Sequence, residues 1–348
     1  MSRLARVLIP VRRLPALLLL AAGLDARPAE DADGAIAKGV AWLRGEQAAD
    51  GSFGQGAGET ALALLALRHG GVPVPDRACL RAAAYLERVL PDGTVYGASL
   101  AILALLAQDR ERHRKTVARL VADLVAGQCL NGQWTYAYRA TARKKGGDNS
   151  NTQLAILALA AARAQRLEVP AAIFQRCHAF LVATQNADGG FGYSDKQRSS
   201  SYGSMTAGGA MALALAAPPE EGAARERPEV RRALDWLGRD LDVTKNAGAG
   251  RAFGGKKGKV SDTFWRTYWL WSLERAAAAA GAREIGGLDW HALGTAFLLE
   301  VQRDDGSWSD PEKPLQATCF ALLFLTRSTR ATLTPRDRDA PVTPRNGD

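Results

Sequence analysis

The stretch Gln47-Ala-Ala-Asp-Gly51-Ser-Phe53 decides the fold, because its glutamine, glycine and aromatic residue return at the same spacing three more times. The further copies are Gln128-Cys-Leu-Asn-Gly132-Gln-Trp134, Gln185-Asn-Ala-Asp-Gly189-Gly-Phe191 and Gln302-Arg-Asp-Asp-Gly306-Ser-Trp308. Two degenerate copies, around residues 90–93 and 241–251, bring the chain to six units. A repeat of this size determines the architecture of the whole chain, so it is interpreted before any single residue.

Each copy lies between two different kinds of apolar segment. The segments before the copies are amphipathic, with charges on one side: residues 35–47, 79–90, 116–128, 172–185, 229–241 and 291–302. The segments after them are apolar nearly all round: residues 60–67, 99–107, 152–162, 205–216, 267–280 and 318–326. A helix with one apolar stripe faces solvent on its other side, whereas a helix that is apolar throughout is buried. The sequence therefore predicts an all-α fold of twelve helices, alternately outer and inner.

The six helical hairpins are predicted to close into an (α/α)6 toroid, with an apolar inner ring and an amphipathic outer ring. An open solenoid is the structural alternative. It would leave one face of the inner helices on an exposed concave surface, and segments such as residues 60–67 are too apolar for that position. Alanine and glycine in residues 205–216 also allow the close backbone approach that a narrow inner ring needs.

The repeated motif itself is interpreted as structural. Its glycine follows the end of a predicted helix, where glycine adopts the left-handed conformation that other residues resist. The glutamine can bond polar groups at the helix end, and the aromatic residue can cover them. The motif therefore predicts the fold and not the chemistry.

The two ends of the chain differ in composition from the repeats. Residues 1–29 are predicted to be a secretory signal, because arginines precede a short apolar run from Leu14 to Leu24 that small residues follow. That run is too short for a comfortable membrane span. Residues 30–328 form the predicted toroid domain, and residues 329–348, rich in proline and charge, are predicted to be a disordered tail. The mature protein is expected to be periplasmic or secreted.

Charge and cysteine content exclude some classes of function. The formal net charge is +9, but the basic clusters lack interleaved aromatic residues, so nucleic-acid binding is not predicted. The four cysteines, Cys79, Cys129, Cys177 and Cys319, are scattered and form no metal-binding spacing. They are expected to be buried thiols, with one disulfide as the alternative. Neither a metal nor a cofactor is predicted.

The Gln-x-x-x-Gly-x-Phe/Trp copies resemble the QW repeats of squalene and hopene cyclases. The layout is similar to the alpha-alpha toroid shared with protein prenyltransferase beta subunits, over residues 35–328. Residues 267–275 and 317–325 look like a group of bacterial prenyltransferase and squalene oxidase repeat proteins. The resemblance implies a fold that hosts several unrelated functions.

The catalytic signatures of those families are incomplete in this chain. Hopene-type cyclases carry an Asp-x-Asp-Asp-Thr run whose middle aspartate is a general acid, and the nearest stretch is Asp148-Asn-Ser-Asn-Thr152. Ser150 and Asn151 stand where that family has its second and third aspartates, and neither is a strong acid. Prenyltransferases bind zinc through Asp, Cys and His, and Leu315-Gln-Ala-Thr-Cys319 has no histidine at the corresponding place. The resemblance therefore does not bring either activity with it.

Polar and aromatic residues gather at the predicted starts of the inner helices, which face one mouth of the ring. The catalytic candidates are Asp148 and Asp262, and the ligand-binding candidates are Asn149, Asn151, Thr152, Tyr202, Trp265, Tyr268 and Gln316. The two aspartates could converge on a ligand, with Trp265 and Tyr268 as an aromatic wall for a cation, an isoprenoid or a sugar. The alternative is that the polar residues cap their helices.

Three functions follow from this collar. The first is an exported, non-catalytic protein that binds a lipid, a glycan or a protein through the mouth. It predicts a narrow or filled ring and no acid with a perturbed pKa. The second is a terpenoid-cyclase or prenyltransferase-type enzyme acting on an isoprenoid, and it predicts a deep aromatic cavity with a carboxylate whose pKa is raised by burial. The third is a toroidal glycosidase or lyase that uses Asp148 and Asp262 as its two carboxylates. The incomplete catalytic signatures favour the first.

Overall fold

The structure is a computed structural model that describes residues 29–89, 93–137, 146–194, 199–218, 223–253, 261–309 and 313–334. The predicted signal segment lies outside these residues, except for Ala29, where the first described helix begins.

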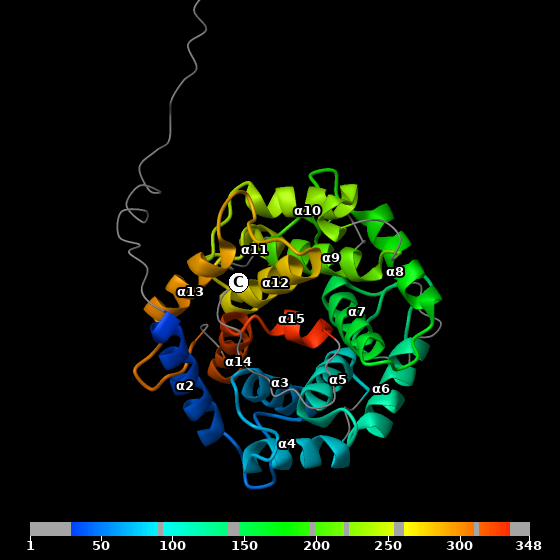
Figure 1. Ribbon diagram of the computed structural model, residues 1–348. Helices are drawn as coiled ribbons and strands as arrows, with labels where there is room; N and C mark the ends of the chain where they lie inside the picture. Colours follow the sequence, from blue (N-terminus) through cyan, green and yellow to red (C-terminus); the bar gives the residue numbers. More distant parts are fainter. Residues whose placement is uncertain are drawn as a thin grey trace, which may run out of the picture.

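Six outer helices surround six inner helices, and the chain alternates between the two rings (Figure 1). The outer helices are α2 (Ala29–Gly45), α4 (Arg77–Arg88), α6 (Arg114–Ala126), α8 (Ala171–Thr184), α10 (Pro228–Gly238) and α13 (Trp290–Val301). The inner helices are α3 (Ala57–His69), α5 (Val95–Asp109), α7 (Asn149–Ala164), α9 (Gly203–Ala216), α12 (Arg266–Ala280) and α14 (Pro314–Leu325). The short elements are η1 (Ala224–Glu226), α11 (Ala249–Phe253) and α15 (Ser328–Leu333). Only isolated β-bridges, and no strands, occur in the described part of the chain.

The inner ring is closed. Each inner helix packs against the next one along the chain, and α14 packs against α3, so the last unit meets the first. Figure 1 shows the resulting circle, with α2 next to both α13 and α14. The (α/α)6 toroid is confirmed, and the open solenoid is wrong.

The central turns of the inner helices are buried on all sides. Every residue from Thr60 to His69 of α3 is buried, as is every residue from Asn149 to Ala162 of α7. Because an α-helix turns once in 3.6 residues, runs of this length include the face that looks into the ring. Close packing also depends on small residues: a Cβ on Gly209 would lie 2.4 Å from the ring of Phe191. The described inner helices therefore leave little room for a ligand between them.

The repeated glutamine joins one unit to the next. Its Nε2 donates one hydrogen bond to the carbonyl of its own glycine and a second to a carbonyl of the following outer helix. The pairs are Gln47 with Gly51 (3.1 Å) and Ala78 (2.9 Å), Gln128 with Gly132 (3.0 Å) and Ile173 (2.9 Å), Gln185 with Gly189 (2.8 Å) and Glu229 (2.9 Å), and Gln302 with Gly306 (2.9 Å) and Ala35 (2.9 Å). The last pair connects the sixth unit to the first, so the motif also closes the ring.

The repeated glycine lies against the backbone of the following outer helix. The four glycines have φ angles between 87° and 97°, in the left-handed region. A Cβ would lie 2.4–2.7 Å from a carbonyl oxygen of the neighbouring helix, namely that of Arg81 for Gly51, Arg176 for Gly132, Arg232 for Gly189 and Lys38 for Gly306. Both the dihedral angle and the contact require glycine, and the structural interpretation of the motif is confirmed.

The repeated aromatic residue is fixed by a threonine of the inner helix. Its backbone N–H donates to the hydroxyl of Thr60 from Phe53 (2.9 Å), Thr152 from Trp134 (3.1 Å), Thr206 from Phe191 (3.0 Å) and Thr318 from Trp308 (3.0 Å). All four threonines are buried. This bond holds each glycine turn against the start of the inner helix that follows it.

Replacing Thr318 with valine is expected to lower the free energy of unfolding by about 1 to 3 kcal/mol, because the buried N–H of Trp308 loses its acceptor while the side-chain volume is kept. The change can be measured by urea denaturation. Exposed Thr334→Val is the matched control, and an equal loss in both variants would contradict the role of the threonine.

Helix α15 lies inside the ring (Figure 1). It follows α14 and contacts α7 and α12, so it crosses the end of the ring where the inner helices finish. The prediction of a disordered tail from residue 329 is therefore wrong for residues 329–333, whereas residues 335–348 lie outside the described residues. Thr329 explains the difference, because its backbone N–H and its hydroxyl both donate to the buried carboxylate of Glu274 (3.0 and 2.5 Å).

The four cysteines are buried, and no disulfide joins any two of them in the described part of the chain. Burial raises the pKa of the Cys79 thiol to about 11 and that of Cys177 and Cys319 further, so these thiols stay protonated near neutral pH. They act as small core side chains.

Candidate functional site

The mouth of the ring is the end where the inner helices begin. All inner helices run in the same direction, so their N-termini meet there. The partly exposed residues of the inner helices include Glu59, Tyr96, Tyr268 and Gln316, which belong to the first turn of their helices. The mouth is therefore shallow, and the buried turns of the inner helices lie beneath it.

Asp148 is the N-cap of α7. Its Oδ1 accepts hydrogen bonds from the backbone N–H of Asn151 (2.9 Å) and the hydroxyl of Ser150 (2.6 Å), and its Oδ2 accepts from Nδ2 of Asn151 (2.9 Å). Ser150 and Asn151, which stand where hopene-type cyclases have aspartates, thus donate hydrogen bonds to the carboxylate of Asp148. For Asp148, helix capping is the function that the structure shows.

The other predicted residues of this segment join neighbouring turns. Asn149 accepts from Nε2 of Gln133 (3.0 Å) and donates to the carbonyl of Gly192 (2.9 Å). Thr152 belongs to the threonine contacts described above. Only Asn151 retains an unused group, since its buried Oδ1 has no partner among the described residues.

Asp262 lies in the loop before α12 and not on the helix. Its carboxylate accepts the backbone N–H of Gly250 (2.6 Å), and its carbonyl accepts that of Asn246 (2.7 Å). It therefore holds the segment around α11. Asp148 is bound by the first turn of α7 and Asp262 by residues 246–250, and no hydrogen bond between described residues joins the two aspartates.

Three predicted aromatic residues reach the mouth in different ways. Tyr202 is the buried N-cap residue of α9, and Tyr268 accepts a hydrogen bond from Nε2 of Gln153 (3.0 Å). Trp265 precedes α12 with a φ of 60°, in a region that bulky residues rarely adopt, and remains 37% exposed. Its ring packs edge-on against Tyr268, with 6.3 Å between centroids. Trp265 and Tyr268 are therefore in contact, and their role as an aromatic wall for a ligand stays a prediction.

Gln316 connects the first and last inner helices. Its Nε2 donates to Oε1 of Glu59 (2.7 Å), whereas its Oε1 has no partner among the described residues. An amide oxygen of Gln316 and one of Asn151 thus remain as buried acceptors near the mouth.

Further tyrosines at the mouth were not predicted. Tyr96 stacks on Tyr136 with 6.4 Å between ring centroids, and the hydroxyls of Tyr136 and Tyr193 are hydrogen-bonded. Burial, followed by contacts with neighbouring tyrosines, raises the pKa of Tyr96 and Tyr193. These phenols therefore remain hydrogen-bond donors near neutral pH. Tyr136 and Tyr193 lie in segments between helices, where the repeat pattern gave no signal.

Beneath the tyrosines, α12 carries a buried arginine that was also missed. Arg275 stacks on Trp271, with its Cζ 3.9 Å from the ring centroid, and donates to Gln153 Oε1 (3.2 Å) and Ser272 Oγ (2.8 Å). Trp271 stacks in turn on Phe320 of α14, with 5.1 Å between centroids. This cluster fills the ring below the mouth. Its signal in the sequence is the pair Glu274-Arg275, two charges within a segment that is otherwise apolar.

Glu274 is a buried acid of the inner ring whose pKa departs clearly from its ordinary value. Burial raises the pKa of its carboxyl to about 7, although the hydrogen bonds from Thr329 oppose the shift. Helix α15 covers this carboxyl at the end of the ring opposite to the mouth. The non-catalytic function predicts no perturbed acid, and the raised pKa of Glu274 contradicts that part of the prediction.

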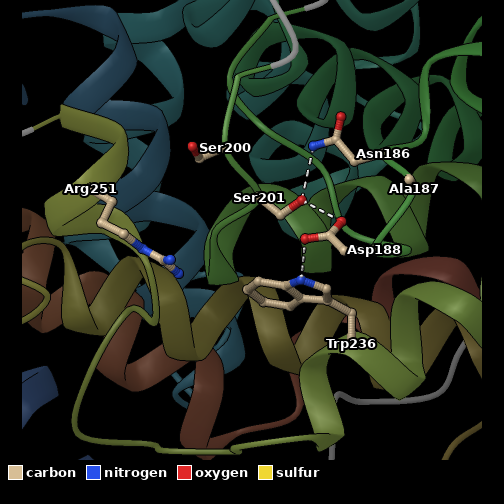
Figure 2. Close-up of a pocket in the computed structure, with 7 residues that line it drawn as sticks. All are labelled: Asn186, Ala187, Asp188, Ser200, Ser201, Trp236 and Arg251. Carbon is tan, nitrogen blue, oxygen red and sulfur yellow. Dashed lines mark hydrogen bonds between the residues drawn. The ribbon is translucent and has the colours of Figure 1, made fainter.

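A small cleft lies at the rim of the mouth, between the glycine turn of the fourth unit and α10 and α11 (Figure 2). Its volume is about 340 Å³, and its lining includes Asp188, Ser201, Trp236 and Arg251. Nε1 of Trp236 and the hydroxyl of Ser201 both donate to the carboxylate of Asp188 (3.0 and 2.8 Å). Asp188, Trp236 and Arg251 were not among the predicted candidates.

Two further properties concern the described residues as a set. They contain no group of three or more His, Cys, Asp or Glu side chains placed to hold a metal ion. They also contain no helix with the length and apolar character that crossing a bilayer requires.

Comparison with known proteins identifies the fold. A family model for the prenyltransferase alpha-alpha toroid domain matches residues 24–328, and no match is found among curated proteins. A solved structure of a variant of the type II terpene cyclase MstE from Scytonema, in complex with geranylgeranyl dihydroxybenzoate, is 17% identical with a TM-score of 0.56. The match covers 86% of this chain and 98% of the cyclase.

The α-1,6-mannanase GH76A of Salegentibacter sp. HEL1_6 is also similar, with 10% identity and a TM-score of 0.60 over 87% of this chain and 99% of the mannanase. An inactive variant of that mannanase, in complex with α-1,6-mannotriose, is 12% identical with a TM-score of 0.59 and the same coverage. Identities this low show a shared fold and not a shared activity. The family match covers most of the chain, and the protein therefore belongs to the prenyltransferase alpha-alpha toroid domain family.

Proposed function

We propose that this protein is an exported, non-catalytic member of its family that binds a glycan at the mouth of the ring. The observation that carries the proposal is the filled ring. Runs such as Thr60 to His69 are buried on every face, and Trp271, Arg275 and Phe320 occupy the space beneath the mouth. An isoprenoid substrate needs a deep cavity, whereas a glycan can lie across a shallow surface.

The state of Asp148 supports the non-catalytic part of the proposal. Its carboxylate accepts three hydrogen bonds, including those from Ser150 and Asn151, and it is thereby used in capping α7. A cyclase needs an acid that donates a proton to an alkene. A glycosidase needs two carboxylates on either side of a bond, and Asp262 is bound instead to Gly250.

The composition of the mouth supports a glycan as the ligand. Sugars present hydroxyl groups together with apolar C–H faces, so their sites combine hydrogen-bonding side chains with aromatic rings. Trp265 is 37% exposed and Tyr136 is 56% exposed, and the amide of Gln316 lies at the same end of the ring. The mannanase complex with α-1,6-mannotriose adds that this fold accommodates an oligosaccharide.

Export is inferred from residues 1–29, whose arginines, apolar run and small residues have the order of a secretory signal. A glycan-binding protein outside the cytoplasm would meet cell-surface or secreted polysaccharides. Fusing residues 1–29 to a periplasmic reporter enzyme tests this part: reporter activity that stays in the cytoplasm would contradict export.

Binding can be tested by calorimetry on the protein with α-1,6-mannotriose, maltotetraose and cellotetraose. At least one saccharide is expected to bind, without release of reducing ends. Trp265→Ala is expected to weaken that binding at least about tenfold, because the exposed ring supplies a stacking surface. Val182→Ala, at an apolar residue 46% exposed on outer helix α8, is the control and should leave binding unchanged.

Two results would contradict the proposal. One is the release of reducing ends from any of the saccharides, which would show a glycosidase. The other is an isoprenoid retained in native mass spectrometry after exposure of the protein to a bacterial lipid extract, which would show that the ring opens to an apolar ligand.

A further inference from the structure

The rim cleft has the size of a small binding site. Its volume of about 340 Å³ falls at the lower end of the range of about 300 to 1,000 Å³ for small-ligand sites. Three parts of the fourth and fifth units form it: the turn at Asn186 and Asp188, the segment at Ser200 and Ser201, and the helices that carry Trp236 and Arg251. Figure 2 shows these side chains around a common space.

Trp236 is held in a fixed orientation. Its Nε1 donates to Oδ2 of Asp188 (3.0 Å), and Gly190 leaves room for the ring, because a Cβ there would lie 2.9 Å from the same nitrogen. The side chain is only partly buried, and Figure 2 shows its ring beside the open space of the cleft. An indole held in this way offers a rigid surface for stacking.

Asp188 is an ionised acceptor at the same place. Its Oδ1 accepts hydrogen bonds from the backbone of Gly190 (2.9 Å) and from Ser201 (2.8 Å). Burial alone would raise the pKa of Asp188, but these bonds, the bond from Trp236 and the charge of Arg239 lower it below its ordinary value. The carboxylate is thus built into the wall of the cleft, with its position fixed from three sides.

Arginine side chains lie beside this carboxylate and in the lining of the cleft. Arg232 and Arg239 donate to the carbonyl oxygens of Asn186 (3.0 Å) and Asp188 (2.8 Å), which places two guanidinium groups beside the turn. Arg251 is exposed, extends toward Trp236 in Figure 2 and has no ion pair with a described residue. Arg239 offsets the charge of Asp188, which leaves Arg251 as the charged group of the lining that can bind an anionic ligand.

The charge and the aromatic ring together define the ligand. A guanidinium binds a carboxylate through two parallel hydrogen bonds, and an indole stacks on the apolar face of a sugar ring. We infer that the rim cleft binds a uronic-acid residue of a polysaccharide, with the sugar ring on Trp236 and its carboxylate on Arg251. The exposed hydroxyl of Ser200 is placed to bond the sugar hydroxyls. This inference rests on the proposed glycan-binding function and names one class of sugar for it.

The inference can be tested by calorimetry on the protein with tetragalacturonate, and with maltotetraose as the neutral counterpart. Tetragalacturonate is expected to bind at least about tenfold more tightly, with an affinity that falls as salt is added. Arg251→Gln and Trp236→Ala are each expected to weaken its binding at least about tenfold. Exposed Arg119→Gln on outer helix α6 is the matched charge control and should have no effect. Thermal melts of all variants show whether they remain folded.

The remaining outcomes separate the two proposals. If the Arg251→Gln variant binds tetragalacturonate as tightly as the unchanged protein does, the proposal of a uronic-acid site in the rim cleft is wrong. The proposal of a glycan site at the mouth is unaffected by that result. Binding that depends on Arg251 but not on Trp265 would support the cleft and contradict the mouth. Complete competition by inorganic sulfate at the same concentration would show an anion site without recognition of a sugar, and no saccharide binding at all would overturn both.

Discussion

Replacing Gly306 with alanine is expected to lower the free energy of unfolding by about 2 to 5 kcal/mol. Two effects add up at this position. A left-handed backbone costs a residue with a Cβ about 1 to 2 kcal/mol, and φ is +87° here. The new methyl group would also lie 2.7 Å from the carbonyl oxygen of Lys38, and relieving such a contact costs about 1 to 3 kcal/mol. Because Gly306 and Lys38 belong to the last and first units, the substitution acts on the closure of the ring.

Gly71 supplies a control with the same backbone angle. Its φ is also +87°, but a Cβ there would meet no atom within 4 Å. Gly71→Ala should therefore show the cost of the dihedral angle alone, about 1 to 2 kcal/mol. Both variants can be compared by urea denaturation followed by circular dichroism. Equal losses of stability would mean that the contact between the last unit and the first contributes nothing.

Glu274 is expected to make the stability of the protein depend on pH. Burial raises the pKa of its carboxyl from 4.5 to about 7, so the folded protein holds a proton there that the unfolded chain has released. The contribution of this group to stability is complete below about pH 4.5 and is lost as the pH rises to about 7. The size of the loss is about 3 kcal/mol, at 1.36 kcal/mol for each pKa unit. The side chain in the Glu274→Gln variant cannot ionise, so this variant should not show the loss of stability.

The measurement compares the free energies of unfolding of the protein and the Glu274→Gln variant at about pH 4.5 and about pH 8. Relative to the original protein, the variant should gain about 3 kcal/mol over this range. The gain should be absent from Glu300→Gln, at an exposed residue of α13. A constant difference between the protein and the Glu274→Gln variant would show that the carboxyl of Glu274 titrates in its ordinary range.

Most of the fold could be predicted from the sequence because each unit repeats the same local physics. The glycine turn requires a left-handed residue, and the segments on its two sides differ visibly in polarity. Helix α15 could not be predicted in this way. Residues 328–333 have no apolar stripe, and their helix is held by Glu274 of another unit, so that only the tertiary structure reveals it. The composition of this segment predicts disorder, but the buried contact between Thr329 and Glu274 orders residues 329–333.

The candidate site was predicted less well, because the residue types that bind ligands also cap helices. Asp148 and Thr152 were chosen for their chemistry, and both stabilise the start of α7. An alignment of the six inner segments would have identified the role of Thr152, since Thr60 and Thr318 occupy the same place in their units. Trp236 and Arg251 were missed for a different reason: they belong to the degenerate fifth unit and come together with Asp188 of the fourth only in three dimensions.

The hydrogen bond from Gln302 to Ala35 has a consequence for folding during synthesis of the chain. The two residues are 267 positions apart, and a chain grows by about 5 to 20 residues per second, so roughly 15 to 50 seconds separate their synthesis. Throughout that interval the flank of α2 that later meets α13 and α14 stays uncovered, while later units can already assemble on one another. The nascent polypeptide thus exposes this flank of α2 until the final hairpin has been synthesised.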